Sequence, residues 1–534
     1  MSQTYDAIVI GGGHNGLVCA AYLAKAGLKV LVLERRDKVG GCAVTEEIMP
    51  GYKVSAVAHA IGMFRPEIMQ ELELKQHGLE IYTTDPTLLM LYAPDDGVLF
   101  LPSSGQAWED PTKTDLSAQE AGEYERLFET IGRIAEVLEP TFLMPPLTEE
   151  ELKQRFAQAG LANQYESVFY GSVCDFLAQF ALSERLKMTL VPLGLTMSWG
   201  GPNTPGTAYN LFRLSTAQAE GKPGAWGFVR GGMGALSEAL AKAAQQAGAD
   251  IHTGAEVEKI LVSEGQATGV VLKACPGPES AKEGRNSGEV LESRLIVSNA
   301  DPKRTFLSLV EASHLPEPFR QQIAGTMMRG AGMKILCALD GLPEFHAMPG
   351  PIAPRAGAIL IAPSLDYLAR AWQDAQNGRP SEQPLMELTI QSATDPTLAL
   401  AGKHVMSIHV QWTPYHLREG SWEQLGEPYA DQVIEQLSAY IPNLKEILLA
   451  RKVLTPLDLE QTFYLTEGHW EHGEMIAGQL FATRPLPGWA HYRTPIAGLY
   501  LCGAGTHPGG TVSGAPGYNA AQHILRDRFG VKGS

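Results

Sequence analysis

A glycine-rich turn near the N-terminus places the tightest constraint on how this 534-residue chain can fold. Gly11, Gly13 and Gly16 have the GxGxxG spacing, which allows a tight turn, a close approach to a pyrophosphate and a close helix–strand contact. The turn follows the apolar run Tyr5–Ile10, which predicts a buried strand, and it opens a helical pattern that Gly27 closes as a C′ glycine. We therefore expect a strand–turn–helix unit that binds phosphate at the start of the helix.

The residues after this helix extend the prediction to a β-α-β unit. Leu28–Leu33 is a second apolar run, so the two strands are parallel and belong to a doubly wound sheet. Glu34 ends this strand 18 residues after Gly16, where a carboxylate can accept hydrogen bonds from a ribose 2′-hydroxyl and would repel the 2′-phosphate of NADP. The phosphates would lie at the helix start, near His14 and Asn15. The alternative is a structural turn beside an ordinary surface glutamate.

The segment that follows Glu34 bears on the choice between FAD and NAD. Arg35 and Arg36 come next, and the glycine pair Gly40-Gly41 begins six residues after Glu34. This spacing resembles the E-x-R-x-x-x-G-G extension of the amine-oxidase and carotene-desaturase class of flavoproteins. The resemblance implies FAD, with Arg36 near the ribose or phosphate and the glycine pair passing the pyrophosphate. Arg36 as a solvated surface charge is the alternative.

The C-terminal segment supports the same domain. Gly498–Leu501 predicts a strand, a glycine-rich loop runs on to Gly517, and Tyr518–Arg528 predicts a helix. A helix N-terminus that meets an isoalloxazine ring can stabilise negative charge on a reduced flavin. Taken alone, the segment is also compatible with an ordinary strand–loop–helix.

Secondary-structure patterns between these ends predict two excursions from the nucleotide domain. The first contains β-like runs near Tyr82 and Leu88–Tyr92 and then long amphipathic stretches, which predict a largely helical cap. The α/β pattern returns near Gly227, with the following expected elements: a turn at Phe228–Gly234, a helix at Ala235–Gln246, strands at Val257–Val262, Ala267–Leu272 and Leu295–Ser298, and a surface loop at Cys275–Gly288.

The expected fold class is therefore α/β: a discontinuous Rossmann-like FAD-binding domain, of the amine-oxidase and glutathione-reductase kind, with an inserted α+β substrate or cap domain. We expect the FAD-binding domain to comprise residues 1–60, 216–302 and 480–534. The cap would comprise residues 61–215 and 303–479.

Composition excludes several classes of function. The formal charge of −17 opposes binding to nucleic acid. Six scattered cysteines, with no Cys-x-x-Cys, predict no disulfide framework and no dithiol chemistry. Only the short lead Met1–Thr4 precedes the first strand, and no apolar stretch is long enough to span a bilayer, so we expect a cytoplasmic protein without a targeting peptide. Ser183–Trp199 is a candidate for peripheral contact with a membrane. The oligomeric state stays open.

The whole chain resembles the phytoene-desaturase superfamily of FAD-dependent oxidoreductases. Within it, the chain is most similar to the branch of the CrtO-type β-carotene ketolases and the pyridine nucleotide-disulfide oxidoreductase domain-containing protein. The matching segments are Gly11–Leu17, Gly231–Leu236, Val297–Pro302, Gly468–Pro485 and Leu501–Gly510. Members of this branch do not share one reaction, so the substrate stays open.

The resemblance implies non-covalent FAD beneath a cap that forms an apolar tunnel. It places Val257 at the adenine, and it places four residues along the pyrophosphate or flavin: Gly503, Ala504, Val512 and Ser513. A dedicated NADPH domain is not expected, because the sequence contains no second GxGxxG.

Hydride transfer from carbon to a flavin needs little acid–base assistance, so catalytic residues are hard to predict. His59, at the cap junction, and His507, in the flavin loop, are the candidates, and each is also compatible with a structural histidine. Arg213 and Arg230 are weaker candidates for contact with substrate or flavin. We expect no metal site, because the cluster His469, Glu471, His472 and Glu474 is more typical of a solvated turn than of a complete ligand set.

Aromatic residues near the second domain junction either line a substrate tunnel or pack in the core: Trp199, Tyr209, Phe212, Trp226 and Phe228. Three functions stay open. The first is an FAD enzyme for a polyisoprenoid such as a carotenoid, by desaturation, isomerisation, reduction or ketolation, and it predicts a long apolar cavity. The second is an oxidase or dehydrogenase for an amine or another small molecule, which needs an aromatic cage or a carboxylate. The third is a flavin-bearing interaction protein with a plugged tunnel.

Overall fold

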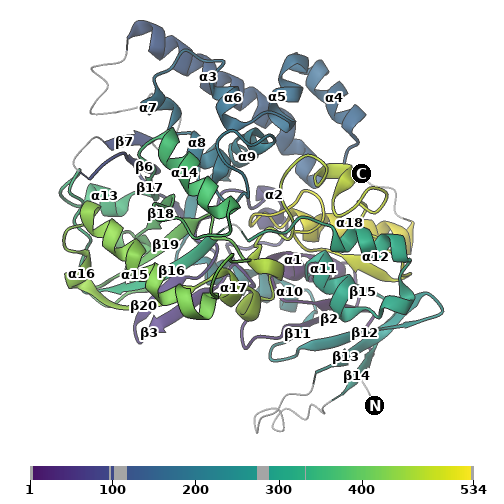
Figure 1. Cartoon of the computed structure of the whole chain (residues 1–534). Coiled ribbons are helices and arrows are strands. Elements are labelled where there is room, and N and C mark those ends of the chain that lie inside the picture. The colour runs from purple at the N-terminus through teal and green to yellow at the C-terminus, as the bar shows by residue number, and fades with distance from the viewer. Residues whose placement is uncertain (1–3, 95–97, 102–116, 274–287, 331, 531–534) are drawn as a thin grey trace.

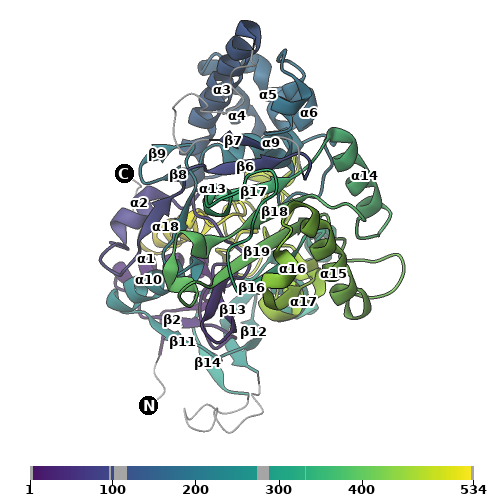
Figure 2. The same ribbon diagram turned by 90° about the vertical axis from the view of Figure 1, so that its left-hand side faces the viewer.

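The computed structural model describes residues 4–94, 98–101, 117–273, 288–330 and 332–530 (Figure 1). Two sequence predictions lie wholly or largely outside these residues, namely the lead Met1–Thr4 up to Gln3 and the loop Cys275–Gly288 up to residue 287. Three layers surround the site: a parallel sheet, a larger mixed sheet and a helical cap, and the cap lies at the top of both views (Figures 1 and 2).

The first layer is a five-stranded parallel sheet, as the β-α-β pattern predicts. Its strands, in spatial order, are β11 (Asp250–His252), β2 (Val30–Leu33), β1 (Ala7–Ile10), β15 (Ile296–Ser298) and β21 (Leu499–Leu501). Every residue of β1 and β2 is buried, because both faces of the sheet are covered. The predicted α/β class with a Rossmann-type sheet is confirmed.

Alternation along β1 shows how the two faces are packed. Ala7 and Val9 lie in the core formed with the helices α1 (His14–Lys25), α10 (Met233–Gln246) and α18 (Ala515–Phe529). Ile8 and Ile10 face the opposite core, which contains the antiparallel strands β12 (Val257–Ser263) and β13 (Gln266–Leu272), with β14 (Val290–Glu292) beyond them. Because β2 and β15 lie on opposite sides of β1, the loops after β1 and β15 diverge and open a crevice at the carboxyl ends of the strands.

The second layer is a seven-stranded mixed sheet. Its strands, in spatial order, are β20 (Leu448–Leu454), β16 (Gly332–Leu339), β19 (His404–Gln411), β18 (Met386–Thr389), β17 (Ala358–Ile361), β6 (Leu88–Leu91) and β7 (Val98–Leu101). One face packs against α15 (Trp422–Tyr440). The sheet combines strands from both predicted excursions, since β6 pairs with β17.

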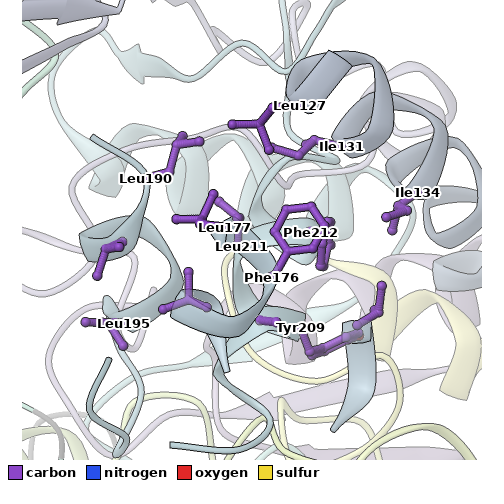
Figure 3. Packing of buried hydrophobic residues seen from close by; sticks show 14 of the residues in the cluster. Leu127, Ile131, Ile134, Phe176, Leu177, Leu190, Leu195, Tyr209, Leu211 and Phe212 are labelled. Carbon is purple, nitrogen blue, oxygen red and sulfur yellow. The ribbon is translucent and has the colours of Figure 1, made fainter. Parts of the chain in front are cut away.

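The third layer is the cap, whose helices bury a core rich in leucine and phenylalanine (Figure 3). Its helices are α3 (Ala118–Leu138), α4 (Glu149–Gln158), α5 (Tyr165–Phe169), α6 (Val173–Leu177), α7 (Glu184–Lys187), α8 (Val191–Leu195) and α9 (Thr207–Leu214). Capping boxes fix where three of them begin, at Ser117 for α3, Thr148 for α4 and Ser172 for α6. The segment Ser183–Trp199 buries its large side chains, Leu186 and Leu190 among them, in this core, and membrane contact there stays a prediction.

One local prediction needs correction. Phe228 and Val229 lie in the short strand β10 (Gly227–Val229) and not in the turn expected at Phe228–Gly234. The reason is tertiary, because β10 pairs with β5 (Ile81–Thr83), far away in the sequence. The remaining helices and strands are β3 (Thr45–Met49), β4 (Tyr52–Ser55), α2 (Pro66–Glu71), β8 (Gln218–Ala219), β9 (Lys222–Pro223), α11 (Pro302–Arg304), α12 (Glu317–Ala324), α13 (Ile352–Arg355), α14 (Leu365–Gln376), α16 (Leu444–Ile447) and α17 (Pro456–Phe463).

The single-turn segments that connect them are η2 (Glu139–Leu143), η3 (Ala162–Gln164), η4 (Thr305–Leu309), η5 (Ala312–His314), η6 (Gln391–Ala393), η7 (Pro396–Leu398), η8 (Thr466–Gly468) and η9 (Phe481–Thr483). Across the residues that the structure describes, no helix combines the length and the apolar character that a membrane span requires.

Candidate active site

A cavity of about 1240 Å³ joins the three layers. One end lies at the crevice beside β1 and β15, and the rest extends between the mixed sheet and the cap. This volume exceeds the ~300–1,000 Å³ of ordinary ligand pockets. It has room for a dinucleotide and a second ligand.

The glycine turn after β1 is built without space for side chains. A Cβ on Gly16 would lie 2.2 Å from the carbonyl oxygen of Gly11, and a Cβ on Gly13 would lie 2.8 Å from Nδ2 of Asn299. Gly13 is the N-cap of α1, and no side chain caps the helix. The first backbone N–H groups of α1 are therefore available to an anion such as a pyrophosphate.

Glu34 lies in the cavity wall, and its carboxylate is held by two backbone groups. Oε2 accepts from the N–H of Gly12 and Oε1 accepts from the N–H of Arg36, each at 2.8 Å. Burial raises the pKa of Glu34, and the two backbone hydrogen bonds oppose this effect. Each oxygen retains a lone pair that can accept from a ribose hydroxyl.

The two arginines after Glu34 differ in what they contact. The guanidinium of Arg35 donates to the carbonyl oxygens of Thr462 and Gln461 and lies over the ring of Tyr464. Arg36 donates Nη2 to Glu46, while its Nη1 is buried without a partner in the cavity wall. Arg36 thus keeps a donor for a ligand, whereas Arg35 is occupied by the end of α17.

The predicted cofactor residues divide into those that line the cavity and those behind its wall. The lining residues are Gly11, Gly13, His14, Asn15, Glu34, Arg35, Arg36, Gly41, Val257, Ala504 and Val512. Gly16, Gly40, Gly503 and Ser513 lie behind them. Gly40 and Gly503 keep the wall thin, because a Cβ on either would lie 2.5–2.6 Å from a backbone oxygen.

Unpartnered polar atoms identify the cavity as a site for a polar ligand. Buried polar atoms are normally hydrogen-bonded. Seven residues of the cavity wall nevertheless bury a side-chain nitrogen or oxygen without a partner: His14, Asn15, Arg36, Arg304, Trp470, His472 and Thr511. This set of donors and acceptors around a glycine cradle fits a dinucleotide such as FAD.

A second polar group lies on the mixed sheet. Lys334 on β16 is opposite His409 on β19, and His409 is opposite Glu387 on β18. Lys334 Nζ donates to His59 Nδ1 at 3.0 Å, and His59 Nε2 donates to Glu387 Oε1 at 3.0 Å. All four side chains line the cavity, and Lys334 is only 2% exposed.

His507 has a different position from His59. Its Nε2 contacts the carbonyl oxygen of Thr141, and its ring packs against Phe481. It does not line the cavity but joins the flavin loop to the cap. Burial lowers its pKa to about 4, so the ring is neutral.

The weaker candidates lie mostly outside the cavity. Arg213 pairs with Glu471 at 2.8 Å, and Arg230 pairs with Glu80 at 2.6 Å. Glu471 and His472 reach the cavity wall, and the described part of the chain contains no group of three metal-binding side chains. Of the aromatic candidates, Trp226 and Phe228 line the cavity, while Tyr209 and Phe212 pack in the cap core and Trp199 packs against it (Figure 3).

Comparison with known proteins decides the family. The family described as flavin containing amine oxidoreductase matches residues 16–333. The chain is also 38% identical to pyridine nucleotide-disulfide oxidoreductase domain-containing protein 2 of Mus musculus, over 99% of this chain and 94% of that protein. The chain belongs to the flavin-containing amine oxidoreductase family. It is an FAD-dependent oxidoreductase, and the resemblance to this superfamily is confirmed.

More distant relatives bear on the substrate. A polypeptide of the limonene dehydrogenase of Castellaniella defragrans is 26% identical, with 98% of this chain and 94% of that protein covered. The neurosporene-forming phytoene desaturase of Cereibacter sphaeroides is also 26% identical, with 97% and 93% covered. Among solved structures, a putrescine oxidase mutant has a TM-score of 0.61 at 14% identity, with 98% of each chain covered, and shows the shared fold.

Several lining residues of this FAD enzyme were not singled out from the sequence. Asn299, at the carboxyl end of β15, donates to the carbonyl oxygen of Gly11 at 3.3 Å. Its position after a strand of the parallel sheet is the signal that could have revealed it. The signal for Lys334 is a lysine inside the otherwise apolar strand Gly332–Leu339.

Proposed function

We propose that this oxidoreductase acts on an apolar, isoprenoid-type substrate, from which hydride passes to FAD. The observation that carries the proposal is the composition of the cavity wall beyond the nucleotide loops. The wall there is formed by Met63, Leu88, Ile131, Ala135, Leu190, Leu193, Met197, Leu211, Leu214, Trp226, Phe228 and Leu360.

An apolar wall of this extent favours a hydrocarbon. Burying apolar ligand surface against it contributes about 25 cal/mol per Å². Polar groups of a ligand would find few partners there, since the polar side chains of the wall gather at the glycine turn and around Lys334. The names of two relatives, a limonene dehydrogenase and a phytoene desaturase, agree with substrates of this class.

An amine is the second candidate, since the fold is also that of a putrescine oxidase. Glu387 supplies the carboxylate that such a site needs, but His59 already binds it and the cation of Lys334 lies close by. The cation would repel an ammonium ion. The apolar wall therefore favours the isoprenoid over the amine.

The residues that would hold FAD are the glycine turn and Glu34 at the adenosine and pyrophosphate end, with Val257, Ala504 and Val512 along the same wall. The cofactor supplies hydride acceptance when bound. The protein orients the substrate and excludes water, because the cap covers the cavity.

The experiment is anaerobic reduction of the holoprotein, followed at the visible flavin band. One panel contains carotenoids and smaller isoprenoids in micelles, and the other contains mono- and diamines. Bleaching by an isoprenoid, with a product of lower hydrogen content by mass, supports the proposal. Bleaching by amines alone overturns it. If dithionite bleaches the flavin and neither panel does, the proposal also fails, and a reductive or interaction role gains support.

A variant locates the substrate within the cavity. Leu193 on α8 lines the apolar wall, so Leu193→Trp narrows it without touching the nucleotide loops. We expect full flavin content and a lower rate of flavin reduction, by about tenfold or more. Leu400→Trp, at an exposed position outside the cavity wall, is the matched control and leaves the rate unchanged.

A further inference from the structure

A continuous hydrogen-bonded chain of three side chains lies in the cavity wall. It runs from Lys334 Nζ through both ring nitrogens of His59 to Glu387 Oε1, with 3.0 Å at each contact. His59 accepts at Nδ1 and donates at Nε2, so its neutral tautomer is fixed by the two partners. Lysine and glutamate are rarely buried, and both cost free energy in this position unless they are paired.

The mixed sheet sets this arrangement. Lys334, His409 and Glu387 occupy one row across β16, β19 and β18, so their side chains emerge on the same face. The row continues into apolar residues on both sides, at Leu454 on β20 and Leu360 on β17. The polar triplet is therefore confined to the part of the sheet that faces the cavity.

The environment assigns the charges. Burial alone would raise the pKa of Glu387, but His59 next to it lowers that pKa to about 2. Burial lowers the pKa of Lys334 to about 8, and the charge of Glu387 limits the decrease. Burial also lowers the pKa of His59, as does the neighbouring Lys334. At neutral pH the chain is a carboxylate, a neutral imidazole and an ammonium, and only Lys334 changes charge within the physiological range.

We infer that Glu387 and His59 position the amine of Lys334 to take up the proton that the substrate loses as it is oxidised. The inference rests on the proposed function, because it requires a substrate that is oxidised in this cavity. One C–H bond gives its hydrogen and both electrons to FAD. The adjacent C–H or heteroatom–H bond breaks, its electron pair forms the new double bond, and its proton binds the neutral Nζ of Lys334, which becomes an ammonium.

Other ionisable groups near this chain are few or already paired. His409 hydrogen-bonds Gln411, and burial, together with Lys334, lowers its pKa to about 3, so it stays neutral. From β3, Glu46 pairs with Arg36 and Lys38. From α17, Asp458 caps its own helix and Glu460 binds Tyr415. Glu387 is thus the anion that controls the charge of Lys334.

The first test needs no substrate. NMR of the holoprotein labelled at lysine Cε follows the titration of Lys334, whose signal is assigned by its loss in Lys334→Met. We expect its midpoint to lie below that of the other lysines and to fall by about one pH unit or more in Glu387→Gln, because the anion that stabilises the ammonium is removed. An unchanged midpoint in Glu387→Gln would overturn the positioning role. Glu474→Gln is the matched control, since it alters a buried, ion-paired glutamate outside the cavity.

The second test uses whichever substrate bleaches the flavin. The rate of flavin reduction should rise about tenfold per pH unit up to the midpoint of Lys334 and then level off. Glu387→Gln should move this bend to lower pH, while Lys334→Met lowers the rate ~10²–10⁴-fold and removes the bend. A uniform loss of rate with an unmoved bend overturns the inference. If no substrate reduces the wild-type flavin, the proposed function has failed, and the NMR shift alone decides whether Glu387 positions Lys334.

Discussion

At the scale of single residues, the cofactor end of the cavity depends on positions that exclude a side chain. Gly16 is the clearest case, because its missing Cβ would overlap the carbonyl oxygen of Gly11 at 2.2 Å. That oxygen belongs to the turn itself, which must keep its shape to leave the first N–H groups of α1 free. A single methyl group at this position therefore tests the whole cradle.

We predict that Gly16→Ala yields protein with little bound flavin and a lower melting temperature. Overpacking of this kind costs about 1–3 kcal/mol, and the displaced turn no longer fits a pyrophosphate. The ratio of flavin to protein absorbance and a thermal melt measure both effects. Gly122→Ala is the control: it is exposed within α3, with open space around it, and should stabilise the protein by about 0.5–1 kcal/mol. Full flavin content in Gly16→Ala would contradict the prediction.

Residues of the glycine turn could be predicted because their signal is local. Gly11, Gly13, Gly16 and Glu34 lie within one β-α-β unit, where spacing along the chain determines proximity in space. Lys334 could not be assigned in this way. It meets Glu387 only through the register of three strands and meets His59 through the packing of a distant loop.

At the scale of elements, the loop segments around the flavin end are held together by one buried side chain. Arg484 donates to the carbonyl oxygens of Glu471, Gly473, Glu474, Gln479 and Ala504. These carbonyls lie in loops without regular hydrogen bonding, so the planar guanidinium with five N–H donors satisfies them. Burial lowers the pKa of Arg484 to about 10, which still leaves it charged.

We predict that Arg484→Lys destabilises the protein by about 3 kcal/mol or more and weakens flavin retention. Lysine keeps the charge but has three donors, so carbonyl groups of both segments stay buried without partners. Thermal unfolding and flavin release on dilution measure these effects. Arg126→Lys serves as the control, since Arg126 is half exposed on α3 and should change stability by less than about 0.5 kcal/mol. Equal melting temperatures for the two variants would refute the prediction.

Elements with strong periodicity could be predicted, and pairings between distant strands could not. The helix expected at Ala235–Gln246 is present as α10, because its apolar spacing and start are encoded locally. Local sequence predicts a turn where β10 lies, since the partner strand β5 belongs to another segment. The mixed sheet likewise joins β6 with β17, which no local pattern could indicate.

At the scale of the whole molecule, contacts between the cap and the parallel-sheet layer determine how the cavity is closed. The predicted division into five segments stays a prediction. What the structure shows is a small number of side chains that bridge the layers, among them Arg213 with Glu471 and His507 with Thr141. These bridges are buried, so their protonation contributes to the stability of the closed form.

Buried neutral histidines should make this closed form sensitive to acid. Burial lowers the pKa of His507 from 6.5 to about 4. Between these two values the unfolded chain binds a proton that the folded chain does not, so the free energy of unfolding falls as the pH falls below 6.5. Above pH 6.5 the ring is neutral in both states and this contribution is complete.

We predict that His507→Gln reduces the loss of stability between pH 7 and pH 5 by about 2 kcal/mol, since one pH unit corresponds to ~1.4 kcal/mol for each such group. The glutamine amide can still donate to the carbonyl oxygen of Thr141, so the bridge is kept while the titrating ring is removed. Melting temperatures of wild type and variant at both pH values give the difference. His416→Gln, at an exposed ring, should titrate like the wild type. An equal decrease in melting temperature for His507→Gln and wild type would mean that the acid sensitivity arises elsewhere, with His14, His409 and His469 as the remaining buried histidines whose pKa burial lowers to about 3 or 4.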